Sequence, residues 1–183
     1  MRHPFQVISI INSSLLLAVL TALTLILMGV LGKISKPLSI PDVAPNGIIS
    51  LEFAGNSARA KAIVAAWRNK GVLQNANLVQ WLDFLYIAAY STTLSLACIW
   101  STKLLSDFDS AWLSTGLVLA WGQWLAALLD VIENLTLFPF LYRDVDDKAV
   151  WAQVAAFCAV LKFSLIITGL LYVAISLVAL VVT

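Results

Sequence analysis

The sequence predicts an all-α fold: a four-helix transmembrane bundle, antiparallel in up-down order, within one membrane domain over residues 1–183. Composition is the first reason, since 61% of the residues are apolar and 11% are charged, against about 45–50% and about 25% in soluble domains. The second is the spacing of the charges, which leaves uncharged stretches of 29, 19, 20 and 21 residues. A helix needs about 20 apolar residues to cross a bilayer, so an ordinary soluble globule is excluded.

These stretches locate the elements of the bundle. We expect spans near 8–31, 79–101, 111–136 and 149–180. The apolar core of the first span is much longer than the 7–15 residues of a secretory signal, so this span should stay as an anchor.

Lysine and arginine counts predict the orientation. The connections 33–78 and 137–148 share one side of the membrane and together hold eight of these residues, whereas the other side has only Arg2 and Lys103. Because cytoplasmic loops are enriched in Lys and Arg, we expect the loop 33–78 to be cytoplasmic and both termini to face outward.

Composition also excludes several kinds of site. The net charge of +1 and the absence of a long basic run argue against a nucleic-acid partner. The single histidine, His3, lies in the N-terminal tail, so the spans have no imidazole for haem or zinc. Cys98 and Cys158 should differ in height by roughly 15 Å, too far for a disulfide. We therefore expect no cofactor and no metal.

The long loop should contain one regular helix. Three prolines break its first part, and residues 48–53 suggest a short strand or an extended stretch. A helix over about 57–70 is predicted by a capping residue, Asn56 or Ser57, and by Gly71 at its end. Its apolar face, which includes Trp67, either lies at the lipid headgroups with Trp67 as an anchor or caps the bundle.

Four ionisable residues fall inside the predicted spans: Asp83, Asp130, Glu133 and Lys162. A charge within the bilayer costs at least about 2.5–3.5 kcal/mol, so each is a candidate for function. The three carboxyls should share a layer roughly 5–10 Å inside the cytoplasmic boundary, which the long Lys162 side chain can approach. Asp130 and Glu133 are one helical turn apart and should repel each other if both ionise.

Helical periodicity adds further polar residues to this layer, because the polar positions of each span fall on one stripe. The candidate ligand-binding residues are Asp83, Tyr86, Tyr90, Gln123, Asp130, Glu133, Asn134 and Lys162. No residue is assigned a catalytic role.

The tryptophans have a simpler interpretation. Trp81, Trp100, Trp112 and Trp151 lie near predicted span ends and are typical of an interfacial aromatic belt. Trp121 and Trp124 lie deeper and fit either lipid contact or the wall of a cavity.

The segments Trp81–Leu85, Leu128–Asn134 and Lys162–Phe163 resemble those of small uncharacterised bacterial four-span membrane proteins, over most of the chain. This resemblance implies a bacterial plasma-membrane location and no known activity. In architecture the chain is also similar to the emopamil-binding and sigma-2 receptor class, whose four-helix cores hold carboxylates in a pocket for sterol-like ligands. Some members also use histidine, which these spans lack, so no residue role is carried over.

Three functions fit the sequence. The first is binding of a lipid-like or other apolar small molecule at the polar layer, with acid/base chemistry left open. The second is a structural or assembly subunit, in which the polar residues only hold helices together. The third is a proton or ion pathway. The expected partners are membrane lipids, an apolar small molecule, and either a second copy of the chain or another membrane subunit.

Overall fold

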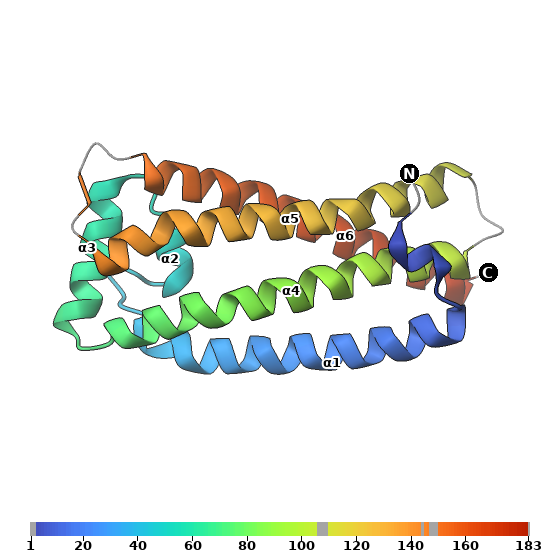
Figure 1. Ribbon diagram of the computed structural model, residues 1–183, viewed down its shortest axis with the longest axis horizontal. Coiled ribbons are helices and arrows are strands. Elements are labelled where there is room, and N and C mark those ends of the chain that lie inside the picture. The colour runs from blue at the N-terminus through green and yellow to red at the C-terminus, as the bar shows by residue number, and fades with distance from the viewer. Residues whose placement is uncertain (1–2, 106–109, 144, 147–149, 183) are drawn as a thin grey trace. The chain divides into compact units, whose positions relative to one another are not determined.

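The computed structural model describes residues 3–105, 110–143, 145–146 and 150–182. These residues form an all-α bundle, with no β-strand among them and one isolated bridge between Ile40 and Ala44. The helices, labelled in part in Figure 1, are η1 (Pro4–Val7), α1 (Ile10–Ser35), η2 (Lys36–Leu38), α2 (Ile48–Glu52), α3 (Ser57–Asn69), α4 (Leu73–Leu104), α5 (Ser110–Tyr142) and α6 (Trp151–Val182).

Four of these helices, α1, α4, α5 and α6, are long and apolar enough to cross a membrane. Their existence confirms the four predicted membrane helices, and the chain is an integral membrane protein. The helices run past the predicted spans on the side of the long loop: α4 begins at Leu73 rather than near 79, and α5 ends at Tyr142 rather than near 136. Uncharged stretches mark the apolar part of a helix, whereas its polar ends continue into water. The antiparallel up-down order stays a prediction.

The chain divides into two compact units. The terminal unit comprises Met1–Leu25, Ala88–Leu128 and Lys162–Thr183, and the loop unit comprises Ile26–Ile87 and Leu129–Leu161. Each long helix contributes one part to each unit, so we describe the units separately.

In the loop unit, α3 has the predicted boundaries. The Asn56 side chain accepts a hydrogen bond from the Arg59 amide at 2.8 Å, and Gly71 follows the helix with a φ of 75°. Asparagine satisfies an amide at a helix start, and glycine adopts the left-handed conformation that ends a helix. Both local signals in the sequence were therefore sufficient to place this helix.

Of the two interpretations of α3, the one with Trp67 as an anchor at the lipid headgroups is wrong. Its side chain is fully buried in the core of the loop unit, and its Nε1 donates a hydrogen bond to the Leu38 carbonyl oxygen at 2.8 Å. The rest of the apolar face of α3 is buried with it: Ala60, Ile63 and Val64. Because the chain itself covers this face, α3 cannot lay it into a membrane, and the alternative of a capping helix is the one that fits.

The prediction of a short strand or an extended stretch over residues 48–53 is also wrong. Ile48–Glu52 forms the short helix α2. The preceding Gly47 has a φ of 59° and redirects the chain, and the Asn46 amide donates to Ser50 Oγ at 3.0 Å. The helix packs against α3 with Leu51 fully buried. Tertiary burial thus overrides the strand preference of the two isoleucines.

In the terminal unit, a close approach of α5 and α6 is built around Gly116. The Tyr172 ring stacks on Trp112 with centroids 4.8 Å apart, and its hydroxyl donates to the Trp112 carbonyl at 3.2 Å. A Cβ atom on Gly116 would fall within 2.5 Å of the Thr102 methyl group and closer still to the Tyr172 hydroxyl. Only glycine fits between these side chains.

We predict that Gly116→Ala destabilises the protein by about 1–3 kcal/mol, the usual cost of overpacking. The stacked Tyr172 ring cannot move aside without losing its contacts. Gly29→Ala in α1 is the matched control, since a Cβ there meets no atom within 4 Å. Apparent melting temperatures in detergent would measure both, and equal values would contradict the close approach at Gly116.

Candidate functional site

A chain of side-chain hydrogen bonds joins α4 to α5 in the loop unit. Gln80 Nε2 donates to Asn134 Oδ1, and Asn134 Nδ2 donates to Asp83 Oδ2 at 2.6 Å. Gln80 and Asn134 are buried, whereas Asp83 is half-buried. Because Asn134 accepts from one neighbour and donates to the other, its amide orientation is fixed. The chain therefore ends on a carboxylate held in one position.

The other predicted residues of this unit lie on the same two helices. Asp130 is buried and Glu133 is fully buried on α5, and Tyr86 is half-buried one turn after Asp83 on α4. The loop unit thus holds five of the eight candidates, with Asp83 and Tyr86 as the two that keep some exposure. A site accessible to a ligand would be reached through these two side chains.

The remaining three candidates, Tyr90, Gln123 and Lys162, belong to the terminal unit, and all are buried. Gln123 Nε2 donates to the Leu165 carbonyl at 2.9 Å. Gly169 leaves space for the Gln123 side chain, because a Cβ atom at that position would clash with the Gln123 amide. Its Oε1 is buried without a hydrogen-bond partner. Lys162 Nζ lies 5.0 Å from the centroid of the Phe163 ring. Gln123 thus has a helix-packing role that its polarity alone did not reveal.

The chemistry of the loop-unit cluster is that of a hydrogen-bond acceptor. Its three carboxyl groups and the Tyr86 phenol offer oxygen atoms, and Asp83 accepts from an amide that is itself fixed. Within the described part of the chain, no group of three or more His, Cys, Asp or Glu side chains is arranged to hold a metal ion. A ligand that donates hydrogen bonds or carries a positive charge is the natural complement of this cluster.

Comparison of the chain with protein-family models, curated proteins and solved structures gives no match. The resemblances drawn from the sequence stay predictions, and the function has to be argued from the residues themselves.

A second buried site, in the terminal unit, was missed by sequence reasoning. His3 is almost fully buried, and its Nε2 lies 3.1 Å from Ser95 Oγ. Its Nδ1 accepts a hydrogen bond from the Phe5 amide at 3.3 Å, so the neutral ring carries its hydrogen on Nε2 and donates it to Ser95. The His3 amide donates to Gln6 Oε1 at 2.8 Å, so His3 and Gln6 form a capping box that holds this turn, with Pro4 as the first residue of η1.

Aromatic rings surround the imidazole. Its centroid lies 4.8 Å from both Trp121 and Trp124 and 5.2 Å from Phe5. Lys103 secures the same segment, because its Nζ donates to the carbonyl oxygens of Phe5, at 3.1 Å, and Ile8. Trp121 and Trp124 therefore line a site for the N-terminal segment of the chain itself.

We predict that the stability held by His3 is lost in mild acid. Burial lowers the pKa of the His3 imidazole below its ordinary value of 6.5. The unfolded chain therefore takes up the proton more readily than the folded chain, so this contribution is complete above about pH 6.5 and declines as the pH falls below that value. Protonation would place a hydrogen on Nδ1, where the Phe5 amide now donates.

The measurement is the apparent melting temperature from pH 8 to pH 5 for the wild type and His3→Gln. The wild type should lose more stability than the variant, whose side chain does not titrate. Parallel curves would show that His3 stays unprotonated or that its burial contributes nothing.

We also predict that Asn134→Leu destabilises the loop unit by about 2 kcal/mol or more. The substitution leaves the buried Gln80 amide without its acceptor, which costs about 1–3 kcal/mol, and it also removes the hydrogen bond that Asn134 donates to Asp83. Asn12→Leu, at an exposed position of α1, is the control. Thermal unfolding in detergent compares the two, and a loss no larger than that of the control would disprove a stabilising role of the chain.

Proposed function

We propose that this protein binds a lipid-like molecule, whose polar end is held by the carboxyl and amide cluster of the loop unit. The apolar part of such a ligand would lie along the membrane helices, in the same hydrocarbon environment as a lipid chain. The polar end would carry a hydroxyl or amino group, because the cluster consists mainly of hydrogen-bond acceptors.

One observation carries this proposal: Asp83 is half-buried, while the two amides that position it are buried. A carboxylate within an apolar span is costly. The Gln80–Asn134 pair holds Asp83 in place before any ligand arrives, so little ordering would be needed on binding. In ligand-binding sites, a few precisely positioned polar groups fix the orientation of a mostly apolar ligand, and Asp83 would act in this way.

Neighbouring residues supply the rest of the proposed site. Tyr86 lies one helical turn from Asp83 and offers a phenol that can both donate and accept. Asp130 and Glu133 are further carboxyl groups of the cluster, on α5. The arrangement suits recognition of a polar group, and no residue is assigned a catalytic role.

The location that accompanies this function is a bacterial plasma membrane, with the loop 33–78 in the cytoplasm and both termini outward. Support comes from the eight Lys and Arg residues of the connections 33–78 and 137–148. The ligand would then enter from the cytoplasmic leaflet.

The test is Asp83→Asn, which removes the charge but keeps an oxygen that can accept from Asn134. Native mass spectrometry of gently purified protein should show a bound lipid-like molecule in the wild type and at least about tenfold less in the variant, as expected for the loss of one charged hydrogen bond. The apparent melting temperature should change little, because the hydrogen-bond chain survives.

Asp42→Asn is the matched control, since it makes the same substitution on an exposed residue of the same unit. It should retain the molecule. Wild-type protein that carries no molecule, or equal retention in both variants, would refute binding at Asp83. A large loss of stability in Asp83→Asn with no change in bound molecules would instead favour a structural subunit.

A further inference from the structure

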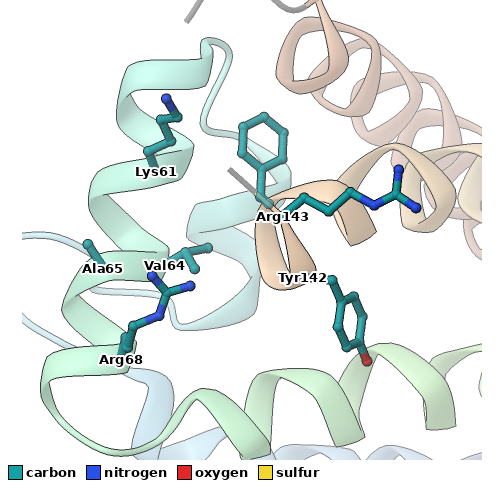
Figure 2. Close-up of a pocket in the computed structure, with 7 residues that line it drawn as sticks. Lys61, Val64, Ala65, Arg68, Tyr142 and Arg143 are labelled. Atoms are coloured by element: carbon teal, nitrogen blue, oxygen red, sulfur yellow. The ribbon is translucent and has the colours of Figure 1, made fainter. Parts of the chain in front are cut away.

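A pocket of about 500 Å³ lies between α3 and the end of α5 in the loop unit. Figure 2 shows that its basic side chains do not converge on one point, because Arg143 points away from α3. The surroundings of His3 in the terminal unit differ from this pocket, since side chains from η1, α4 and α5 meet at the imidazole. We call residues 3–7, which comprise His3 and η1, the N-terminal latch.

The first end of the latch is packed against α4 and α5, as the dark blue segment of Figure 1 shows. The buried His3 imidazole has its centroid 4.8 Å from those of Trp121 and Trp124. The Phe5 ring contacts both the imidazole, at 5.2 Å, and Trp124, at 5.9 Å. The packing of Phe5 therefore depends partly on the position of His3.

The other end of the latch is tied to the bundle at Ile8. Lys103 of α4 donates hydrogen bonds to the Ile8 carbonyl oxygen and, at 3.1 Å, to that of Phe5. The same ammonium donates to Ser13 Oγ in the first turn of α1 at 3.4 Å. Because the bond at Ile8 does not involve the imidazole, Ile8 is an anchor about which the latch can move outward.

Protonation of His3 is incompatible with the latch as it is built. In the neutral ring, Nδ1 accepts the Phe5 amide at 3.3 Å, and Nε2 carries the hydrogen that Ser95 receives. A second proton goes to Nδ1, where it faces the hydrogen of the Phe5 amide. The charged imidazole therefore loses the bond with which it caps η1.

The groups around His3 do not compensate for its charge. The described residues of the terminal unit include no carboxyl group, and those of α1 and α5 in this unit include no titratable side chain. Tyrosine, cysteine and lysine, which are neutral or positive in mild acid, are the titratable residues of α4 and α6 in this unit: Tyr90, Cys98, Lys103, Lys162 and Tyr172.

The two tryptophans do not reverse this balance. An indole face attracts a cation, but it offers no lone pair to the new hydrogen on Nδ1. Burial accordingly lowers the pKa of the His3 imidazole below 6.5. The latch is therefore most stable above about pH 6.5 and loses stability as the pH falls below that value.

We propose that residues 3–7 form a pH-sensitive latch, which lies on α4 and α5 while His3 is neutral and is released when His3 takes up a proton. Release would uncover Ser95, Trp121 and Trp124. The long helices would stay folded, because a segment held by a few contacts opens locally. The latch shares no residue with the Asp83 cluster and does not depend on the proposed function.

Hydrogen–deuterium exchange of the full-length protein in detergent measures this release, through the peptide that contains residues 3–8. Labelling times at pH 7.5 and pH 5.0 are scaled to the chemical exchange rate at each pH, so that a difference reports opening. Two variants bracket the protonation state, because His3→Gln stays neutral with a donor and an acceptor, whereas His3→Arg stays charged. His3 is the only histidine of the chain, so His3→Gln removes all imidazole titration.

Corrected exchange of the latch amides in the wild type should be at least about tenfold faster at pH 5.0 than at pH 7.5. The limit is about 30-fold, because a free imidazole with a pKa of about 6.5 is about 30 times more often charged than neutral at pH 5.0. His3→Gln should show no such change, and His3→Arg should already exchange faster than the wild type at pH 7.5. Peptides of α4 and α5 should keep their protection throughout.

Three results would overturn the latch. Equal corrected exchange of the wild type at both pH values would show that acid does not release the segment. The same acceleration in His3→Gln would assign the pH response to another group. Loss of protection in α4 and α5 at pH 5.0 would show that the terminal unit unfolds as a whole. Fast exchange of His3→Gln at both pH values would support the proposal, because the imidazole would then be what holds the latch.

Discussion

The constraint on which the rest of this structure depends is that polar groups removed from water must find partners inside the protein. The buried amides of Gln80 and Asn134 meet this requirement by bonding to each other and to Asp83. Because each amide has a fixed donor and acceptor, the bonds tie one position of α4 to one position of α5. An apolar helix pair could slide by a turn at little cost, whereas this pair cannot without stranding a buried group. The same side chains therefore set the packing of the loop unit and hold its half-buried carboxylate.

Signals carried by neighbouring residues made much of the fold predictable. The uncharged stretches located all four long helices, and Asn56 with Gly71 located α3, because capping depends on a few adjacent residues. Features that depend on distant residues were not predictable. Trp67 has the position of an interfacial anchor in its own helix, yet the Leu38 carbonyl, 29 residues away, gives its Nε1 a buried partner. The helix at Ile48–Glu52 likewise follows from packing against α3, which two adjacent isoleucines do not reveal.

The candidate sites show the same division. Helical spacing identified Asp83 and Asn134 as candidates, because each belongs to a polar stripe within one span. In the structure their side chains are joined by a hydrogen bond. Gln123 has a comparable position but packs beside Gly169, a contact that no pattern within one helix can show. The sequence predicts His3 to be part of an N-terminal tail, since nothing in the first few residues indicates that Ser95 and two tryptophans enclose it. Its capping partner Gln6 was the only local signal.

The site proposed at Asp83 has a simple physical design. Buried amides form a rigid support, and the side chains that would meet a ligand, Asp83 and Tyr86, keep some exposure. Such support lowers the ordering cost of binding, so that a few contacts suffice. A net charge of +1 for the whole chain therefore conceals a cluster of carboxyl groups among the helices. Such a cluster of hydrogen-bond acceptors would discriminate between ligands by the donors on their polar ends, even where their apolar parts are alike.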